Sequence, residues 1–138
     1  MIYQYMLPSE TTLSYHLDLA RRTIFSGWRS QTESEAYRGG MLQVADLISK
    51  NHIEYWLYNA SKFTAPDLSD QAWTLEVLGP LLAETELKKI AVLVPEDVFL
   101  QAVAEGVRSK AENIFYGKII MENFLDQQSA EDWLLSGS

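Results

Sequence analysis

The side chains that could carry acid–base or nucleophilic chemistry are few in this sequence. It contains no cysteine, two histidines, and no serine in a Gly-x-Ser-x-Gly turn. His16 stands between alternating apolar residues and His52 at a helix-to-strand turn, so we expect structural or surface roles for both. Paired carboxylates such as Glu96 and Asp97 stand at predicted helix ends, where they favour the positive end of the helix dipole. The sequence therefore predicts no catalytic residues and a protein that is not an enzyme.

Motifs for metals, nucleotides and other cofactors are also missing from the sequence. It has no His-x-His, His-Glu-x-x-His or cysteine pair, and no glycine-rich phosphate loop. A formal net charge of -8 and a pI near 4.7 disfavour contact with nucleic-acid phosphates and anionic membranes. We therefore expect no cofactor, no metal, no nucleic-acid partner and no membrane insertion.

The length and composition of the chain predict how many domains position any site and in which compartment the protein acts. A chain of 138 residues, 47% of them hydrophobic, fits one domain over residues 1–138. Residues 1–7 lack the basic leader and the long apolar core of a secretory signal. The absence of cysteine suits a reducing compartment. We therefore expect an acidic cytoplasmic protein.

The first third of the chain predicts a hairpin followed by a helix. Two β-prone runs, residues 13–19 and 23–28, predict antiparallel strands whose turn type and register stay open. Thr32 and Glu35 have the spacing of a capping box, so a helix should begin there and run to about Lys50.

Helix and strand patterns alternate along the rest of the chain. Continuous apolar runs at residues 53–60 and 90–94 predict neighbouring parallel strands that are buried on both faces. A further strand is predicted at residues 118–125, and helices at residues 69–81, 95–113 and 129–134. This order predicts an α/β fold with a single mixed sheet, mostly parallel, an N-terminal antiparallel hairpin and about four helices.

Two glycine positions bear on the geometry of these helices. The pair Gly39-Gly40 in the first helix requires either close packing on a sheet or a local break. Gly79-Pro80 should kink or divide the second helix, because proline removes a backbone hydrogen bond and collides with the preceding turn.

Aromatic side chains suggest two kinds of binding surface. Tyr55, Trp56 and Tyr58 concentrate on one predicted central strand, where they could line a pocket for an apolar ligand or simply fill the core. Trp28, at the end of a predicted strand, is the better candidate for an exposed aromatic anchor at an interface.

Four segments between Tyr37 and Leu134 carry a resemblance to a known family. They are Glu54-Tyr55-Trp56-Leu57-Tyr58-Asn59, Asp70-Gln71-Ala72-Trp73 with Leu78-Gly79-Pro80-Leu81, Lys89-Ile90-Ala91-Val92-Leu93-Val94-Pro95, and Phe124-Leu125-Asp126 with Ala130-Glu131-Asp132-Trp133-Leu134. Together they resemble the SpoIIAA-like branch of the STAS superfamily, the sulfate-transporter and anti-sigma-factor-antagonist domains. The resemblance implies a sheet with helices, no cofactor, and work through protein contact or small-ligand sensing.

Antagonist members of that family present a phosphorylated serine in an Asp-Ser-Ser-Gly-like turn at a helix start. Asp67 and Ser69 match that turn here, whereas Asp70 replaces its glycine and Asn59 replaces an acidic residue at the strand end. The resemblance leaves two roles open for Ser69, regulatory phosphorylation and helix capping. A phosphate at Ser69 would be repelled by Asp67 and Asp70.

Two functions of different classes follow. The leading hypothesis is a non-enzymatic regulatory module that docks a protein partner through the loop Thr64–Asp70 and its helix start, with Ser69, Asp67 and Asp70 on that surface. The alternative is a binder of a small apolar molecule or lipid, held in a pocket beside the three strand aromatics. An exposed apolar patch near Ser69 would favour the first function, and a cavity beside the aromatics would favour the second. The sequence predicts neither the identity of the partner or ligand nor the oligomeric state.

Overall fold

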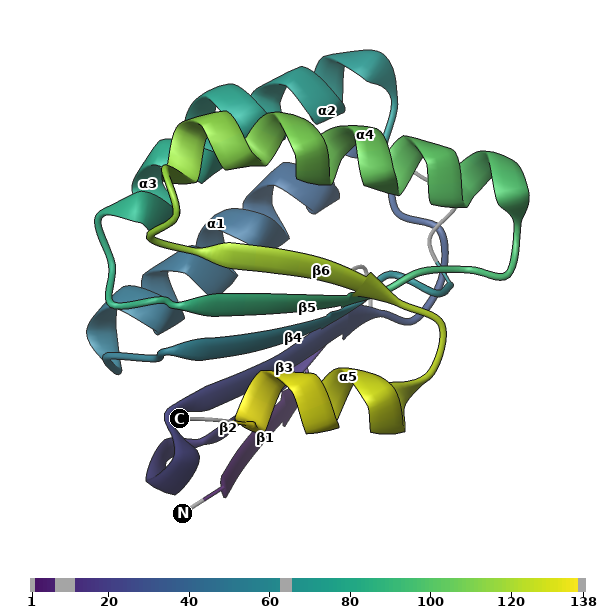
Figure 1. The fold of residues 1–138 in the computed structure, drawn as a ribbon. Helices are drawn as coiled ribbons and strands as arrows, with labels where there is room; N and C mark the ends of the chain where they lie inside the picture. Colours follow the sequence, from purple (N-terminus) through teal and green to yellow (C-terminus); the bar gives the residue numbers. More distant parts are fainter. Residues whose placement is uncertain (1, 7–11, 63–65, 137–138) are drawn as a thin grey trace.

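The strands of the protein form one sheet in the order in which they occur along the chain (Figure 1). The structure is a computed structural model that describes residues 2–6, 12–62 and 66–136. Its six strands are β1 (Ile2–Met6), β2 (Leu13–Asp18), β3 (Thr23–Trp28), β4 (Tyr55–Asn59), β5 (Lys89–Leu93) and β6 (Ile120–Phe124). Strands β1, β2 and β3 are antiparallel, whereas β3 to β6 run parallel. This mixed sheet confirms the predicted α/β class.

Helices cover both faces of the sheet. The first face carries α1 (Ser34–Lys50), α2 (Leu68–Trp73), the π-helical turn η2 (Thr74–Leu78), α3 (Gly79–Ala83) and α4 (Val98–Phe115), and the second carries α5 (Gln127–Leu135) (Figure 1). The parallel strands follow one another in order, so their right-handed crossovers all place helices on the same face. No helix in the described ranges is both long and apolar enough to cross a bilayer.

Strand β1 has no counterpart in the sequence prediction. Its backbone pairs with β2 from Ile2 opposite Asp18 to Met6 opposite Ser14, so the antiparallel part of the sheet has three strands. The predicted hairpin of β2 and β3 is confirmed, with Leu13 opposite Trp28. These strands are joined by a 3-10 turn, η1 (Leu19–Arg21), instead of a two-residue turn.

Helix α1 begins without the predicted capping box. Its N-cap is Glu33, whose side chain makes no capping hydrogen bond. The Thr32 hydroxyl donates to the carbonyl of Ser30 at 3.1 Å and contacts the hydroxyl of Thr12. Because that hydroxyl is used in the loop before the helix, the prediction for Thr32 and Glu35 was wrong.

The glycine pair is accommodated by close packing, one of the two predicted alternatives. A Cβ atom at Gly40 would lie 2.7 Å from Cη2 of Trp28, whereas one at Gly39 would meet nothing within 4 Å. Trp28 is 3% exposed. The indole of Trp28 therefore packs against α1, and the prediction that Trp28 is an exposed aromatic anchor was wrong.

The central strands β4 and β5 are buried on both faces, as predicted. Trp56 packs in the core beneath α1 to α4, while its neighbours Tyr55 and Leu57 pack with α5 in the second core. Side chains alternate between the faces of a strand, so one apolar run supplies both cores.

The last two helices start at aspartates that cap them. Asp97 accepts a hydrogen bond from the Leu100 amide at 2.9 Å, and Asp126 accepts one from the Ser129 amide at 2.8 Å. Leu134 of α5 is fully buried against the second face, so the predicted terminal helix packs on the sheet.

Candidate functional site

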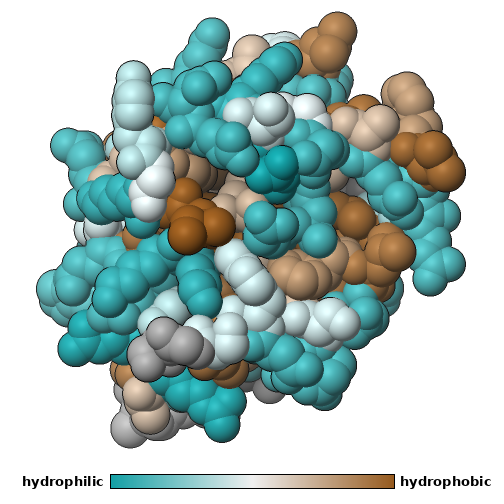
Figure 2. All heavy atoms as spheres, viewed as in Figure 1, coloured by the Kyte–Doolittle hydropathy of each residue, from teal (hydrophilic) through white to brown (hydrophobic). Residues whose placement is uncertain are grey.

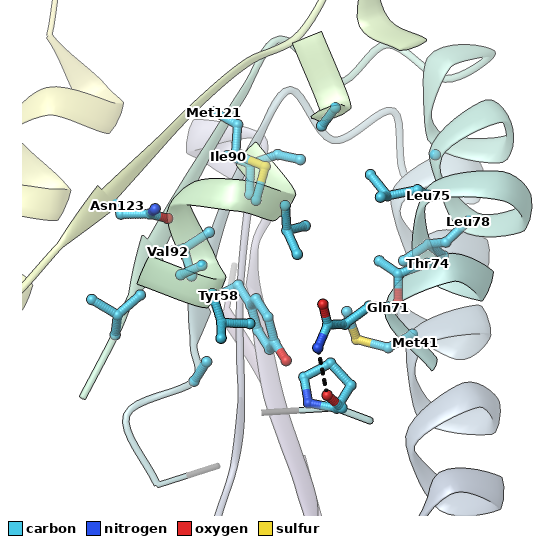
Figure 3. A pocket seen from close by; sticks show the side chains of 18 of the residues that line it. Met41, Tyr58, Gln71, Thr74, Leu75, Leu78, Ile90, Val92, Met121 and Asn123 are labelled. Atoms are coloured by element: carbon cyan, nitrogen blue, oxygen red, sulfur yellow. Dashed lines mark hydrogen bonds between the residues drawn. The ribbon is translucent and has the colours of Figure 1, made fainter. Parts of the chain in front are cut away.

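A cavity of about 130 Å³ lies between the first face of the sheet and the helices that cover it (Figure 3). Its walls are mainly apolar side chains from β5 and β6, from η2 and from α4: Ile90, Val92, Met121, Leu75, Leu78, Val103, Ala104 and Val107. At the ends of β4 and β5 it is bordered by Ala60, Pro66 and Pro95. None of the described residues that line it is charged. The site therefore suits an uncharged, largely apolar occupant.

The helix above the cavity owes its shape to Gly79-Pro80. Proline lacks the amide hydrogen that a regular helix needs and its ring collides with the preceding turn. The chain responds with the π-helical turn η2 directly before Gly79, so the helix is divided there, as predicted. A Cβ at Gly79 would lie 3.3 Å from Cγ2 of Ile114, so α3 packs closely against α4 at this point. Such π-turns are frequent at functional sites, and this one supplies part of the cavity wall.

Two tyrosines bring hydroxyl groups to the cavity. The Tyr58 oxygen accepts a hydrogen bond from Nε1 of Trp28 at 2.7 Å, and burial raises the pKa of Tyr58 well above its ordinary value. The Tyr37 hydroxyl lies 2.7 Å from that of Thr74, which itself donates to the carbonyl of Asp70, so Tyr37 is the donor. Burial raises the pKa of Tyr37 to about 12. Both tyrosines are therefore neutral hydrogen-bond donors at physiological pH.

Two amide side chains complete the polar part of the lining. Nε2 of Gln71 donates to the carbonyl of Pro66 at 2.9 Å, and the side chain extends toward the cavity in Figure 3. Oδ1 of Asn123 is buried and has no hydrogen-bond partner among the described residues. Sequence analysis missed both residues. Asn123 could have been found as a polar residue on the same face of the predicted strand as Met121.

The structure brings together two of the three predicted pocket aromatics. Trp56 and Tyr58 line the cavity, and their rings lie 5.4 Å apart. The indole of Trp56 is anchored by its Nε1, which donates to Oγ of Ser26 at 2.7 Å. Tyr55 projects from the other face of β4 and packs with α5, so it is not part of the cavity.

The predicted helix-start surface is only partly exposed. Asp67 caps α2 by accepting from the amide of Asp70 at 2.8 Å, and Ser69 is exposed. Asp70 is 3% exposed and accepts hydrogen bonds from Oγ of Ser34 and Nε of Arg38, both at 2.7 Å. Asp70 is therefore a buried link between α2 and α1. Of the predicted loop, residues 64 and 65 lie outside the described residues.

The guanidinium of Arg38 places a positive charge next to Ser69. Its NH2 group donates to Oγ of Ser69 at 3.0 Å, and its guanidinium stands 5.4 Å from the ring centre of Trp73. The charge of Asp70, which was expected to repel a phosphate at Ser69, is balanced by this guanidinium.

Large apolar side chains are exposed at the starts of α2 and α4. Leu68 at the start of α2 is 81% exposed, and Val98 and Phe99 at the start of α4 are 84% and 72% exposed. Figure 2 shows apolar atoms protruding at the end of the molecule where α4 begins, on a face that is otherwise largely hydrophilic. Both helix starts lie at the edge of the sheet where the parallel strands end (Figure 1).

Titratable groups gather at the opposite edge, where the parallel strands begin. His52 is paired with Glu86, and Glu54 accepts from Arg22 at 2.9 Å and pairs with Lys88 at 3.2 Å. Desolvation raises the pKa of Glu54, but its two cationic neighbours outweigh it and hold that pKa below the ordinary 4.5.

Neither histidine lines the cavity. The ring of His16 stacks on Phe25 with 4.6 Å between ring centres, and His52 lies in the charged group just described. Within the described ranges, no group of three or more His, Asp or Glu side chains could hold a metal ion.

Comparisons with known proteins identify the fold. No protein-family model matches the sequence, and no curated protein matches it. Among solved structures, the chain is similar to an uncharacterized protein of the DUF3478 family from Shewanella loihica PV-4, which has a SpoIIAA-like fold. The TM-score is 0.52 and the identity 18%, over 96% of this chain and 93% of that chain. The chain therefore has a SpoIIAA-like fold, as the resemblance implied.

Proposed function

We propose that this protein of SpoIIAA-like fold is a non-enzymatic binding module that holds a small, largely apolar molecule in the cavity between its sheet and helices. The observation that carries the proposal is the cavity itself, about 130 Å³ in volume and walled by aliphatic and aromatic side chains. An apolar cavity of roughly 150 Å³ in another protein stays dry and binds benzene. A molecule built on a single six-membered ring therefore suits this volume.

The chemistry of the lining supports binding without catalysis. An acid–base reaction near neutral pH needs a group that titrates in that range, and no histidine or carboxylate lines the cavity in the described part of the chain. The two tyrosines that line it have pKa values raised further from neutrality by burial. Asp70, the buried carboxylate nearest in sequence to the lining residue Gln71, is engaged by Ser34 and Arg38. With an acidic chain that has no cysteine, this module is proposed to act in the cytoplasm.

The experiment fills the cavity and leaves the rest of α4 unchanged. Ala104 lines the cavity, whereas Ala102 is exposed on the same helix. Toluene is titrated into wild type, Ala104→Phe and Ala102→Phe, and binding is followed by methyl NMR signals of Leu75 and Val92. We expect saturable shifts in wild type and in Ala102→Phe, and none in Ala104→Phe. Absence of shifts in wild type, or equal shifts in all three proteins, would contradict the proposal.

Docking of a protein partner is the second candidate, favoured by the exposed Leu68, Val98 and Phe99. Asp67 is exposed beside Leu68, and the carboxylates of Glu96 and Asp97 are exposed beside the two α4 residues. The complementary partner surface would combine apolar side chains with lysine or arginine.

Leu68→Ser tests this second candidate, with Ile120→Ser as a control, because Ile120 is 51% exposed at the start of β6, at the opposite edge of the sheet. Proteins captured from cell extract are quantified for both variants and for Ser69→Ala. Loss of a specific partner with Leu68→Ser alone supports a docking surface, and additional loss with Ser69→Ala supports regulation at that serine. Identical capture by all variants would refute both.

A further inference from the structure

We infer that the molecule held in this cavity is a small neutral alcohol, such as a phenol or a cyclic aliphatic alcohol, whose hydroxyl accepts a hydrogen bond from Tyr58 and donates one to a side-chain amide oxygen. This inference rests on the proposed function and specifies the class of ligand.

The hydroxyl of Tyr58 has an unused hydrogen. Its oxygen serves as acceptor for Nε1 of Trp28 at 2.7 Å, and no described residue accepts the Tyr58 hydrogen. Burial raises the pKa of Tyr58, so the group remains a donor at neutral pH. A hydroxyl donor that lines an apolar cavity without an acceptor costs free energy, and a ligand oxygen at this position would remove that cost.

Two unmatched acceptors complement this donor. Gln71 uses its amide nitrogen for the carbonyl of Pro66, and no described donor contacts its Oε1. Oδ1 of Asn123 is buried and has no described partner. In Figure 3, Tyr58 and Gln71 direct their polar ends toward the same part of the cavity. A hydroxyl can satisfy a donor and an acceptor together, whereas an ether or a hydrocarbon cannot.

Charge excludes the competing class of acidic ligands. No lysine, arginine or histidine is among the described lining residues, so a carboxylate would be desolvated without a counter-ion. We therefore expect phenol to bind and benzoate not to bind.

The test compares phenol, toluene and benzoate, three probes that share one ring and differ in the substituent. Each is titrated into wild type, Tyr58→Phe and Gln71→Leu, with Tyr55→Phe as the control on the opposite face of β4. We expect Tyr58→Phe to weaken phenol binding about fivefold or more, the value of one hydrogen bond. Toluene affinity should change less than about twofold. Tyr55→Phe should change neither.

Tyr58→Phe also removes the acceptor for Nε1 of Trp28, and this loss by itself can disturb the core. Gln71→Leu keeps the inference testable, because it leaves the hydrogen bond between Trp28 and Tyr58 intact. It should also weaken phenol binding relative to toluene. If toluene binds to wild type and phenol does not, or if benzoate binds as well as phenol, the inference about the hydroxyl is wrong while the proposed cavity function stands. If neither toluene nor phenol binds, the proposed function itself fails.

Discussion

Replacing Gly40 by alanine should destabilise the protein, whereas the same change at Gly39 should not. The two glycines are neighbours in α1, so both variants gain the helix propensity of alanine, about 1 kcal/mol. The new methyl group at Gly40 would lie 2.7 Å from Cη2 of Trp28 and 3.3 Å from Cδ2 of Leu13. The indole cannot withdraw freely, because it is buried and hydrogen-bonded to Tyr58.

The magnitude follows from the cost of overpacking a closely packed core, typically about 1–3 kcal/mol. The propensity gain is common to both variants and cancels in their difference. We therefore expect the unfolding free energy of Gly40→Ala to lie about 1–3 kcal/mol below that of Gly39→Ala. Urea denaturation followed by tryptophan fluorescence and circular dichroism measures both values. Equal unfolding free energies would refute the claim that contact with Trp28 requires a glycine at position 40.

Three further substitutions test the polar contacts. Asp70→Ala should lower the unfolding free energy in urea by about 1–3 kcal/mol, because it removes the buried partner of Arg38; an unchanged midpoint would contradict this. The pKa of Glu54 is lowered, so its contribution to stability is present near neutral pH and is lost as the pH falls below 4.5. Glu54→Gln should therefore flatten the acid side of the stability profile, and a profile parallel to wild type would argue against this role. Asp126→Ala removes the cap of α5 and should cost about 1 kcal/mol in thermal unfolding, unlike Asp132→Ala as a control within the same helix.

Most of the secondary structure could be predicted because its signals are local. The apolar runs that became β4 and β5 are read from neighbouring residues, and both strands are buried on two faces as expected. Strand β1 was not predicted, although its residues are β-prone and are followed by Pro8 and Ser9. Its place in the sheet depends on pairing with β2, which no local pattern reports. The capping box failed for a similar reason, since the Thr32 hydroxyl is engaged by Ser30 and Thr12.

The candidate site was predicted in part. Placing Trp56 and Tyr58 at a pocket was correct, but alternation along the strand should have separated Tyr55 from Trp56. The pairing of Asp70 with Arg38 joins residues that are far apart in the sequence, so no local pattern reports it.

The amino-acid sequence by itself determined the α/β class, the parallel central strands and the absence of the known catalytic motifs, because composition and periodicity express these properties directly. The tertiary structure alone decided that Trp28 is buried against Gly40 and that a cavity remains beneath the π-helical turn. Both depend on how side chains from separate elements fill the same space. Such packing arises from contacts between residues that are far apart in the sequence, so no short stretch of sequence contains it.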